Sequence, residues 1–420
     1  MLSSSLHLDL DLDSFPWPAE RPVAVRVHPV AERALKDGHP WLFEDSITSM
    51  SASAGAGDVV VVFDRKNRFL AAGLHDPENP IRARMLVHGE PAEIGPELFR
   101  HRIETALGRR SEVASRDTTA FRVLNGENDG MPGLVVDLYE RTLVIEVFTV
   151  AWLPRLREIV PALRDVLAPE RILLLASNRV GESDLCPPEA AHGSVLLGTS
   201  PQGGVPFLEA GLRFEAHPFE GHKTGFYLDQ RANRCRLGRH AAGARILNVF
   251  SYTGGFSLHA ARGGAAEVVS VDRAEAVLAQ ARRHFDLNRG DPQVSACRHE
   301  TVEGDAFEVM SKLARSGERF DVVVVDPPSF ARAKRHRDKA LGAYRTLTGL
   351  ALPLTRPGGL LVQASCSSRI GAGEFHDAVT GVAETAGRPL QDLEQTGHPP
   401  DHPVSFPEGA YLKCVWGRVP

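Results

Sequence analysis

The sequence has few cysteines, and none of them forms a closely spaced pair. The five cysteines of this 420-residue chain are far apart, at Cys186, Cys235, Cys297, Cys366 and Cys414. No CxxC motif occurs, so we expect no structural zinc site built on paired thiolates. An odd number of thiols in a long chain predicts free cysteines in a reducing compartment, which favours a cytoplasmic protein.

The chain also lacks the segments that mark membrane and secreted proteins. No run of about 18 apolar residues occurs, so we expect no membrane-spanning helix. The start, MLSSSLHLDLDLDSF, has neither the basic residues nor the apolar core of a signal peptide. We expect residues 1–22 to form a loose tail. A hydrophobic content of 43% and a charged content of 24% argue against wholesale disorder.

Positive charge is not in excess, since the formal net charge is −5. This balance counts mildly against a nucleic-acid-binding protein, although affinity depends on local patches more than on the total. One such patch is ARAKRHRDK at 331–339, which includes Arg332, Lys334 and Arg335. We expect these residues to bind RNA phosphates, with the solvated start of a helix as the alternative.

Changes in hydrophobic pattern divide the rest of the chain into three parts. Residues 23–90 alternate like short strands and predict a small β-rich module. Residues 91–210 mix helices and strands and end in a turn-rich connector, which predicts an α+β middle domain. Residues 211–420 alternate nearly continuous apolar strands with helices, which is typical of a parallel sheet covered on both faces. The predicted class is α/β, with a Rossmann-like C-terminal domain.

A nucleoside site is predicted at NVFSYTGGFSLHA, residues 248–260. A buried strand ends there, Gly254 and Gly255 let the backbone approach a ligand, and a helix follows. The next strand ends in Asp272, whose carboxylate can accept both ribose hydroxyls. Asp305 follows VEG and is expected near an adenine amino group. A tight turn without a ligand is the alternative explanation of the glycine pair.

The sequence DPPSF, residues 326–330, separates two classes of enzyme that bind nucleosides. A dehydrogenase usually carries GxGxxG, whereas the turn here reads TGGFS. Asp326 and Pro327 end a strand of four valines, and prolines cannot continue a hydrogen-bonded ladder. Such a loop at the edge of the sheet can hold a target base. The combination predicts a methyltransferase that uses S-adenosyl-L-methionine.

Cys366 is the predicted nucleophile. The strand GGLLVQA runs into Ser365, Cys366, Ser367 and Ser368, whereas a lone cysteine is usually a small buried hydrophobe. A thiolate that adds to C6 of cytosine makes C5 nucleophilic enough to take a methyl group. Asp326 is expected to hydrogen-bond the ring N3 or the amino group and to stabilise the charge that develops there.

The chain resembles the bacterial 23S ribosomal RNA cytosine-C5 methyltransferases that carry an N-terminal PUA domain. The motifs that carry the resemblance are HPWLF (39–43), NGENDGMPGLVVD (125–137), GHKTGFYLDQR (221–231), NVFSYTGGF (248–256), VVSVD (268–272), FDVVVVDPPSF (320–330), SCS (365–367), DHPV (401–404) and EGAYLK (408–413). The resemblance implies that 23–90 is the PUA RNA-binding domain and that Cys366 is the nucleophile. It also implies that Lys223, Phe226, Asp229 and Arg231 border the cofactor or target pocket.

These observations predict two sets of binding residues. The predicted cofactor site comprises Phe226, Asn248, Phe250, Tyr252, Gly254, Gly255, Asp272, Asp305, Asp326 and Pro327. The predicted RNA-binding residues are Lys223, Arg231, Arg332, Lys334 and Arg335. No metal ligands are predicted, since His398, Asp401 and His402 lie in a proline-rich segment and would need an ordered site.

The predicted function is methyl transfer to C5 of a cytosine in 23S ribosomal RNA, either free or in a large-subunit assembly intermediate. A seven-stranded class I methyltransferase domain would carry it out. The alternatives are another base position such as guanine N7 or an exocyclic amine, an RNA-binding assembly factor with vestigial methyl transfer, and a small-molecule methyltransferase. Departures from the family pattern at 177–186 and 342–346 leave the target nucleotide open. The oligomeric state is open too, with a homodimer among the options.

Overall fold

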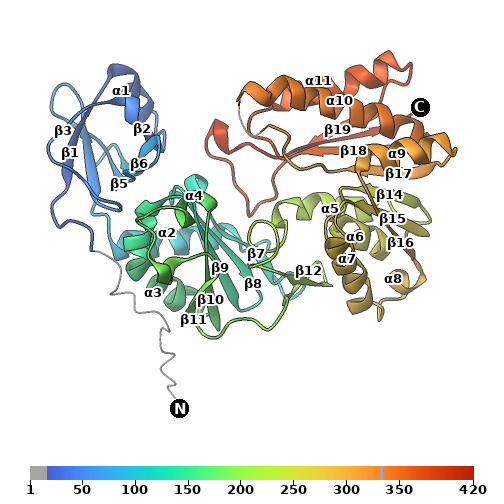
Figure 1. The fold of residues 1–420 in the computed structure, drawn as a ribbon, viewed down its shortest axis with the longest axis horizontal. Helices are drawn as coiled ribbons and strands as arrows, with labels where there is room; N and C mark the ends of the chain where they lie inside the picture. The colour runs from blue at the N-terminus through green and yellow to red at the C-terminus, as the bar shows by residue number, and fades with distance from the viewer. Residues whose placement is uncertain (1–16, 332–333) are drawn as a thin grey trace, which may run out of the picture. The chain divides into compact units, whose positions relative to one another are not determined.

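The computed structural model describes residues 17–331 and 334–420 (Figure 1). Most of the expected tail, residues 1–16, and Arg332 of the basic cluster therefore lie outside the described residues. The chain divides into two compact units. The first comprises the residues up to Leu208 together with Glu215–Leu228 and Pro400–Phe406, and the second comprises Glu209–Phe214, Asp229–Pro399 and Pro407–Pro420.

The first unit begins with a six-stranded sheet whose order is β2-β6-β5-β4-β1-β3. Its strands are β1 (Val23–Val27), β2 (Trp41–Phe43), β3 (Ile47–Met50), β4 (Val59–Phe63), β5 (Phe69–His75) and β6 (Ile81–His88), and helix α1 is Pro29–Lys36. The β1–β4 pair is parallel, and the other pairs are antiparallel. Buried residues alternate with more exposed ones along β1 and β4, as expected for strands with one face on a core.

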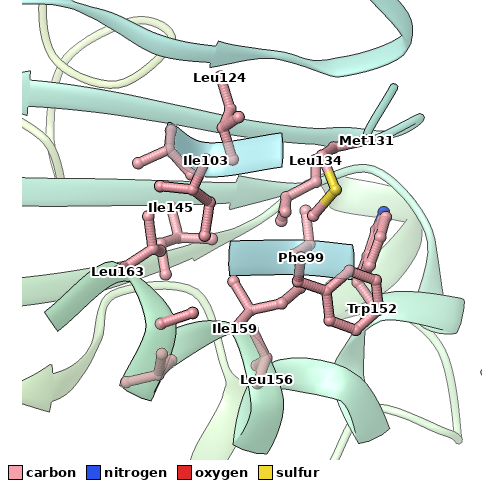
Figure 2. Close-up of a cluster of buried hydrophobic side chains, with 14 of the residues drawn as sticks. Phe99, Ile103, Leu124, Met131, Leu134, Ile145, Trp152, Leu156, Ile159 and Leu163 are labelled. Carbon is pink, nitrogen blue, oxygen red and sulfur yellow. The ribbon is translucent and has the colours of Figure 1, made fainter. Parts of the chain in front are cut away.

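A five-stranded sheet, ordered β11-β10-β9-β8-β7, forms the middle part of the first unit. Its strands are β7 (Ala120–Asn125), β8 (Leu134–Tyr139), β9 (Thr142–Val147), β10 (Arg171–Ala176) and β11 (Ser194–Leu197), and its helices are α2 (Pro96–Arg109), α3 (Leu156–Leu167) and α4 (Asn178–Gly181). The apolar stripes of α2 and α3 face this sheet, where Phe99, Ile103 and Ile159 are fully buried (Figure 2).

A short hairpin, β12 (Val205–Glu209) and β13 (Leu212–Ala216), leads into the second unit. The second unit has a seven-stranded sheet with the order β16-β15-β14-β17-β18-β20-β19. Its strands are β14 (Arg245–Val249), β15 (Glu267–Asp272), β16 (Arg298–Glu303), β17 (Phe320–Val325), β18 (Thr355–Ser365), β19 (Gln391–Thr396) and β20 (Lys413–Arg418). Strands β14 to β18 pair in parallel, whereas β20 is antiparallel to both of its neighbours.

Helices cover both faces of the seven-stranded sheet (Figure 1). One face carries α9 (Ala306–Arg315), α10 (Arg337–Leu354) and α11 (Ala372–Thr385), and the other carries α5 (Arg231–Gly238), α6 (Gly255–Arg262), α7 (Glu275–Leu287) and α8 (Pro292–Ala296). Strands buried on both faces must be apolar throughout, which is why β14 and β17 have the nearly continuous hydrophobic sequences that led to the parallel-sheet prediction. The predicted α/β class with a Rossmann-like C-terminal domain is confirmed.

Candidate active site

Four strand ends meet at one edge of the seven-stranded sheet. Strands β14, β15, β17 and β18 are mutually parallel, with Val249 opposite Val271 and Val325. The chain order reverses beside β14. Strands β15 and β16 lie on one side of it, and β17 and β18 lie on the other. Ligands of open α/β sheets bind at such a switch point, outside the carboxyl ends of the strands. The loops after these four strands hold most of the residues predicted from the sequence.

The loop after β14 has a strained backbone. Phe250, Tyr252 and Gly254 have φ angles of 61°, 47° and 75°. A left-handed φ is energetically costly for residues other than glycine. Gly254 fits for two reasons, since its φ is positive and a Cβ added there would lie 2.8 Å from the Cβ of Ala281. The turn therefore brings the backbone close to α7 before α6 begins at Gly255.

The same loop holds buried hydroxyl groups that the protein does not satisfy. In the part of the chain that the structure describes, Ser251 Oγ and Thr253 Oγ1 are buried and have no hydrogen-bond partner. Buried polar atoms without partners are uncommon in folded proteins and call for a ligand or water. These hydroxyls and the close-packed glycine suit a polar ligand such as a nucleoside at this loop. Asn248 Nδ2 donates to Ser257 Oγ at 2.9 Å, whereas its Oδ1 is also buried without a partner.

Asp272 ends β15 and is held against the strained loop. Its Oδ2 accepts a hydrogen bond from the Tyr252 backbone N–H at 2.8 Å, and its Oδ1 accepts one from the Ala274 N–H at 3.4 Å. The side chain is half-buried. The carboxylate is thus fixed at the strand end where the sequence predicted a ribose-binding acid, and it couples the loops after β14 and β15.

Asp305 caps helix α9. Its Oδ1 accepts from the backbone N–H groups of Phe307 and Glu308, while its Oδ2 pairs with Arg273 at 2.9 Å. The hydrogen bond from Arg273, together with those cap bonds, lowers the pKa of the Asp305 carboxyl. Asp305 is thus the N-cap of α9, a role that was not predicted from the sequence, and adenine binding by this residue stays a prediction.

Asp326 follows β17 and is oriented by a residue of the GHKTGFYLDQR motif. Gln230 Nε2 donates to Asp326 Oδ1 at 3.0 Å, and Asn233 Nδ2 in turn donates to Gln230 Oε1 at 2.6 Å. Thr396 of β19 donates to Asn233 Oδ1 at 2.6 Å, which extends the chain of hydrogen bonds across the sheet edge. A carboxylate held in this way keeps one orientation for a partner in the site.

Cys366 lies beside the loop that Asp326 begins. Its Sγ is 3.9 Å from the carbonyl oxygen of Pro327, and its side chain is half-buried. Two side chains near it were not predicted from the sequence. Tyr344 of α10 hydrogen-bonds Ser365 Oγ at 2.8 Å, and Lys413 of β20 lies opposite Ser365 in the antiparallel pair. The thiol and the DPP loop are therefore close together, as the strand order in the sequence predicted.

The other residues predicted from the long motif are divided between the two units. Lys223 and Phe226 belong to the first unit. There, Lys223 Nζ lies 4.6 Å from the centre of the Tyr227 ring, and Phe226 packs edge-on against Phe207. Arg231, in the second unit, is 7% exposed. Binding of RNA by Lys223 and Arg231 stays a prediction.

The remaining basic residues lie at the start of α10. The 3₁₀ turn Lys334–His336 leads directly into the helix, and Arg335 is exposed. The described part of the cluster thus lies where α10 begins, and phosphate binding there stays a prediction. In the described ranges 17–331 and 334–420, no group of three or more His, Cys, Asp or Glu side chains could hold a metal ion. Over the same residues, no helix combines the length and hydropathy needed to cross a bilayer.

Sequence comparison decides the family. Residues 187–416, more than half of the chain, match the family described as S-adenosylmethionine-dependent methyltransferase, and residues 25–88 match the PUA-like domain. The chain is a member of that methyltransferase family. Its cofactor is therefore S-adenosyl-L-methionine, and its seven-stranded sheet with the switch point beside β14 is the methyltransferase domain.

Curated relatives cover nearly the whole methyltransferase. The "Ribosomal RNA large subunit methyltransferase" of Deinococcus radiodurans is 43% identical over 400 residues, which are 93% of this chain and 96% of the relative. The "Ribosomal RNA large subunit methyltransferase I" of Serratia proteamaculans is 34% identical over 391 residues, 92% of this chain and 97% of the relative. The methyltransferase thus belongs with these RNA methyltransferases, as the resemblance implied.

Solved structures share the fold over almost the full length. A protein assigned as a methyltransferase and solved in complex with SAH has a TM-score of 0.79 and 24% identity, and the match covers 94% of this chain and 99% of that one. A protein from Streptococcus mutans, assigned as a SAM-dependent methyltransferase, has a TM-score of 0.78 and 23% identity, with 94% and 100% covered. At these identities the match speaks for the fold alone.

Proposed function

We propose that the methyltransferase transfers a methyl group from S-adenosyl-L-methionine to C5 of a cytosine in 23S ribosomal RNA, through a covalent bond between Cys366 and C6. The observation that carries this proposal is the position of the Cys366 thiol. Its Sγ lies beside the Asp326–Pro327 loop, 3.9 Å from the Pro327 carbonyl oxygen, at the edge of the sheet where the cofactor loop ends. A methyltransferase that acts on a more nucleophilic atom has no need of a thiol there.

The chemistry of C5 explains why the thiol is needed. C5 of cytosine is a poor nucleophile, and thiolate addition at C6 breaks the aromaticity of the ring and makes C5 enamine-like. C5 can then attack the methyl carbon that a bound sulfonium would supply, and the electron pair of the broken S–CH3 bond would leave with sulfur as a neutral thioether. A base removes the C5 proton, and elimination restores the ring and releases the Cys366 thiolate.

Asp326 has a role that fits its contacts. Thiolate addition at C6 delocalises negative charge over C5 and N3 of the ring. The carboxylate, held by Gln230 at 3.0 Å, can accept a hydrogen bond from the amino group or, when protonated, donate one to N3. A preoriented group of this kind stabilises charge at the moment it develops.

The cofactor is expected at the loops after β14 and β15. Asp272 would accept the ribose hydroxyls, Asp305 lies one strand further along and would face the adenine, and the loop from Phe250 to Gly255 would pass under the nucleoside. The unsatisfied hydroxyls of Ser251 and Thr253 are available to polar groups of the ligand. When bound, the cofactor supplies an electrophilic methyl group.

Ribosomal RNA as substrate rests on the relatives and on the domain composition. The relatives with 43% and 34% identity are named for the large-subunit ribosomal RNA, and the PUA-like match at residues 25–88 adds a module suited to RNA. The basic cluster at the start of α10 would bind phosphates near the target. A base inside a duplex would have to be flipped out to reach the thiol.

The test is methyl incorporation from labelled cofactor into unmodified 23S RNA, followed by nucleoside analysis. Wild-type protein should produce labelled 5-methylcytosine. Cys366→Ala should produce none while it still binds the cofactor, and Cys186→Ala serves as the matched control with normal activity. Label on guanine, on an exocyclic amine, or an unaffected Cys366→Ala protein would overturn the C5 assignment. RNA binding without cofactor binding would instead point to an assembly factor.

A further inference from the structure

A buried lysine lies at the end of β20, next to the strand that delivers the thiol. Lys413 is 6% exposed and begins a strand whose first five residues are all buried. It is opposite Ser365 in the antiparallel β18–β20 pair, and Ser365 directly precedes Cys366. Lysine is among the residues least often buried without a specific partner, so the position calls for an explanation.

The ammonium group of Lys413 is bonded to the turn that contains the thiol. Its Nζ donates to the carbonyl oxygen of Ser367 and, at 2.6 Å, to that of Ile370. These acceptors follow Cys366 in the chain, and the strand partner of Lys413 precedes it. Lys413 thus contacts the chain on both sides of Cys366, through its strand pairing before it and through its ammonium after it. These contacts fix the backbone that orients the thiol.

We propose that Lys413 is a positioning residue for Cys366: it fixes the turn of residues 366–370 and, as a nearby buried cation, favours the thiolate over the thiol. The inference rests on the proposed function, in which the thiolate attacks C6. A thiolate near a lysine forms at lower pH than an isolated thiol does. Lys413 would therefore increase the fraction of Cys366 that is ready to react at neutral pH.

The charges around the thiol agree with this role. Burial lowers the pKa of Lys413 to about 8, against the opposing effect of Cys366, which raises it. Lysine is thus mostly charged at neutral pH. Burial raises the pKa of Tyr344 to about 12, despite its bond to Ser365, so this hydroxyl stays neutral. Cys366 and Asp326 both raise the pKa of Tyr344, so the two acidic groups share one region and a compensating cation there matters more.

The hydrogen bonds of Lys413 also argue against a different assignment. Two of its N–H groups donate to carbonyl oxygens, which cannot serve as donors in return. Carbonyl oxygens accept more strongly from an ammonium than from a neutral amine, so this pair favours the charged form of Lys413. The bonds favour a fixed cation, and we expect the base to be another group.

The test measures the reactivity of Cys366 itself, without RNA or cofactor. Full-length protein is alkylated with iodoacetamide from pH 6 to pH 10, and the rate at each cysteine is followed by peptide mass spectrometry. In wild type, Cys366 should react with a midpoint below the ordinary cysteine value of about 8.5. Cys186, whose pKa is raised by burial, provides the internal comparison with a higher midpoint.

Two variants separate charge from structure. Lys413→Met should move the midpoint of Cys366 upward by about one unit, which lowers its rate at pH 7 by about tenfold, while Cys186 is unchanged. Lys413→Arg keeps a cation and should recover most of the rate. Unfolding of the Met variant would be visible as a general rise in alkylation, and the wild-type midpoint remains decisive in that case.

The outcomes for Lys413 and for the methylated base are distinguishable. A wild-type midpoint at or above the ordinary value, or a Lys413→Met protein with unchanged Cys366 reactivity, would overturn the role of the lysine even if 5-methylcytosine is formed. Conversely, the protein could methylate another base and still show a low midpoint for Cys366 alkylation that depends on Lys413. That result would support the effect of Lys413 on the thiolate and would contradict the C5 proposal.

Discussion

The core under the five-stranded sheet and the strand-end edge of the seven-stranded sheet follow opposite rules. In the core, Phe99 and Trp152 are fully buried with their rings edge-on at 5.7 Å, and the Trp152 indole N–H is satisfied by the Pro132 carbonyl at 2.8 Å (Figure 2). At the edge, left-handed φ angles, unsatisfied hydroxyls and a buried ammonium lie within a few residues of four strand ends.

The difference shows which region of this methyltransferase is suited to ligand binding and catalysis. The core gains stability from apolar contact and leaves little to bind a ligand. The edge holds strained backbone and polar groups without hydrogen-bond partners. Such features are characteristic of sites in which a ligand supplies the missing interactions. Substitutions in the core should consequently change stability alone, whereas substitutions at the edge can also change binding and turnover.

The largest effect is expected in the core. Phe99→Ala removes a fully buried ring and should lower the free energy of unfolding by about 3 to 5 kcal/mol, since both burial and packing are lost. Phe43→Ala, at a ring that is 43% exposed, is the control and should change it by less than about 0.5 kcal/mol. Urea denaturation measures both, and similar losses in the two variants would contradict the contrast.

The next largest effect is expected at the cofactor loop. Gly254→Ala meets both a positive φ and the Ala281 Cβ at 2.8 Å. The strain should cost roughly 1 to 2 kcal/mol and the crowding about 1 to 3 kcal/mol, with a matching loss of cofactor affinity. Gly243→Ala has a similar φ of 67° but open space around it, so it should show only the strain. Calorimetric titration with the cofactor compares them, and equal affinities in the two variants would refute the assignment of the loop.

A smaller effect is expected at the residue that orients Asp326. Gln230→Ala removes the donor 3.0 Å from Asp326 Oδ1. A hydrogen bond to a charged group contributes about 1.5 to 3 kcal/mol, so kcat should fall at least about tenfold while cofactor affinity stays near the wild-type value. Gln391→Ala, on an exposed edge strand, is the matched control. A change in affinity with unchanged kcat would show that Gln230 serves the cofactor instead.

The smallest effect is expected at Asp305. Asp305→Asn retains a capping oxygen for α9 but loses the charge beside Arg273, which is 81% exposed. Because such exposed pairs contribute little, stability at pH 7 should change by less than about 1 kcal/mol. The lowered pKa of Asp305 means that its contribution is present above the unfolded value of about 3.9 and is lost as pH falls below it. Wild type and variant should therefore converge in acid, and a gap that widens there would contradict the ion pair.

The sequence was sufficient for the features that depend on periodicity and on strand ends. The apolar strands ending at Val249, Asp272 and Val325 predicted a parallel sheet, and parallel strands must bring their carboxyl ends to one edge. Asp272, Asp326 and Cys366 could therefore be assigned to the same edge from the sequence alone.

Long-range contacts were beyond such reasoning. Gln230 reaches Asp326 across 96 positions, and no local pattern specifies that pairing. Lys413 looked like an ordinary member of EGAYLK, although a lysine that begins the buried strand KCVWG was a signal that could have been used. The capping role of Asp305 could also have been found, since an aspartate directly before an apolar helix is a common N-cap.

The central claim is a covalent bond between Cys366 and the target cytosine. The most direct measurement uses 23S RNA transcribed with 5-fluorocytidine, incubated with protein and cofactor and analysed by peptide mass spectrometry. Fluorine at C5 cannot be removed as a proton is, so the methylated adduct should persist as an RNA-linked peptide containing Cys366, and only when cofactor is present. Methyl transfer to this RNA without any trapped peptide, or a nucleotide attached to a different residue, would contradict the account.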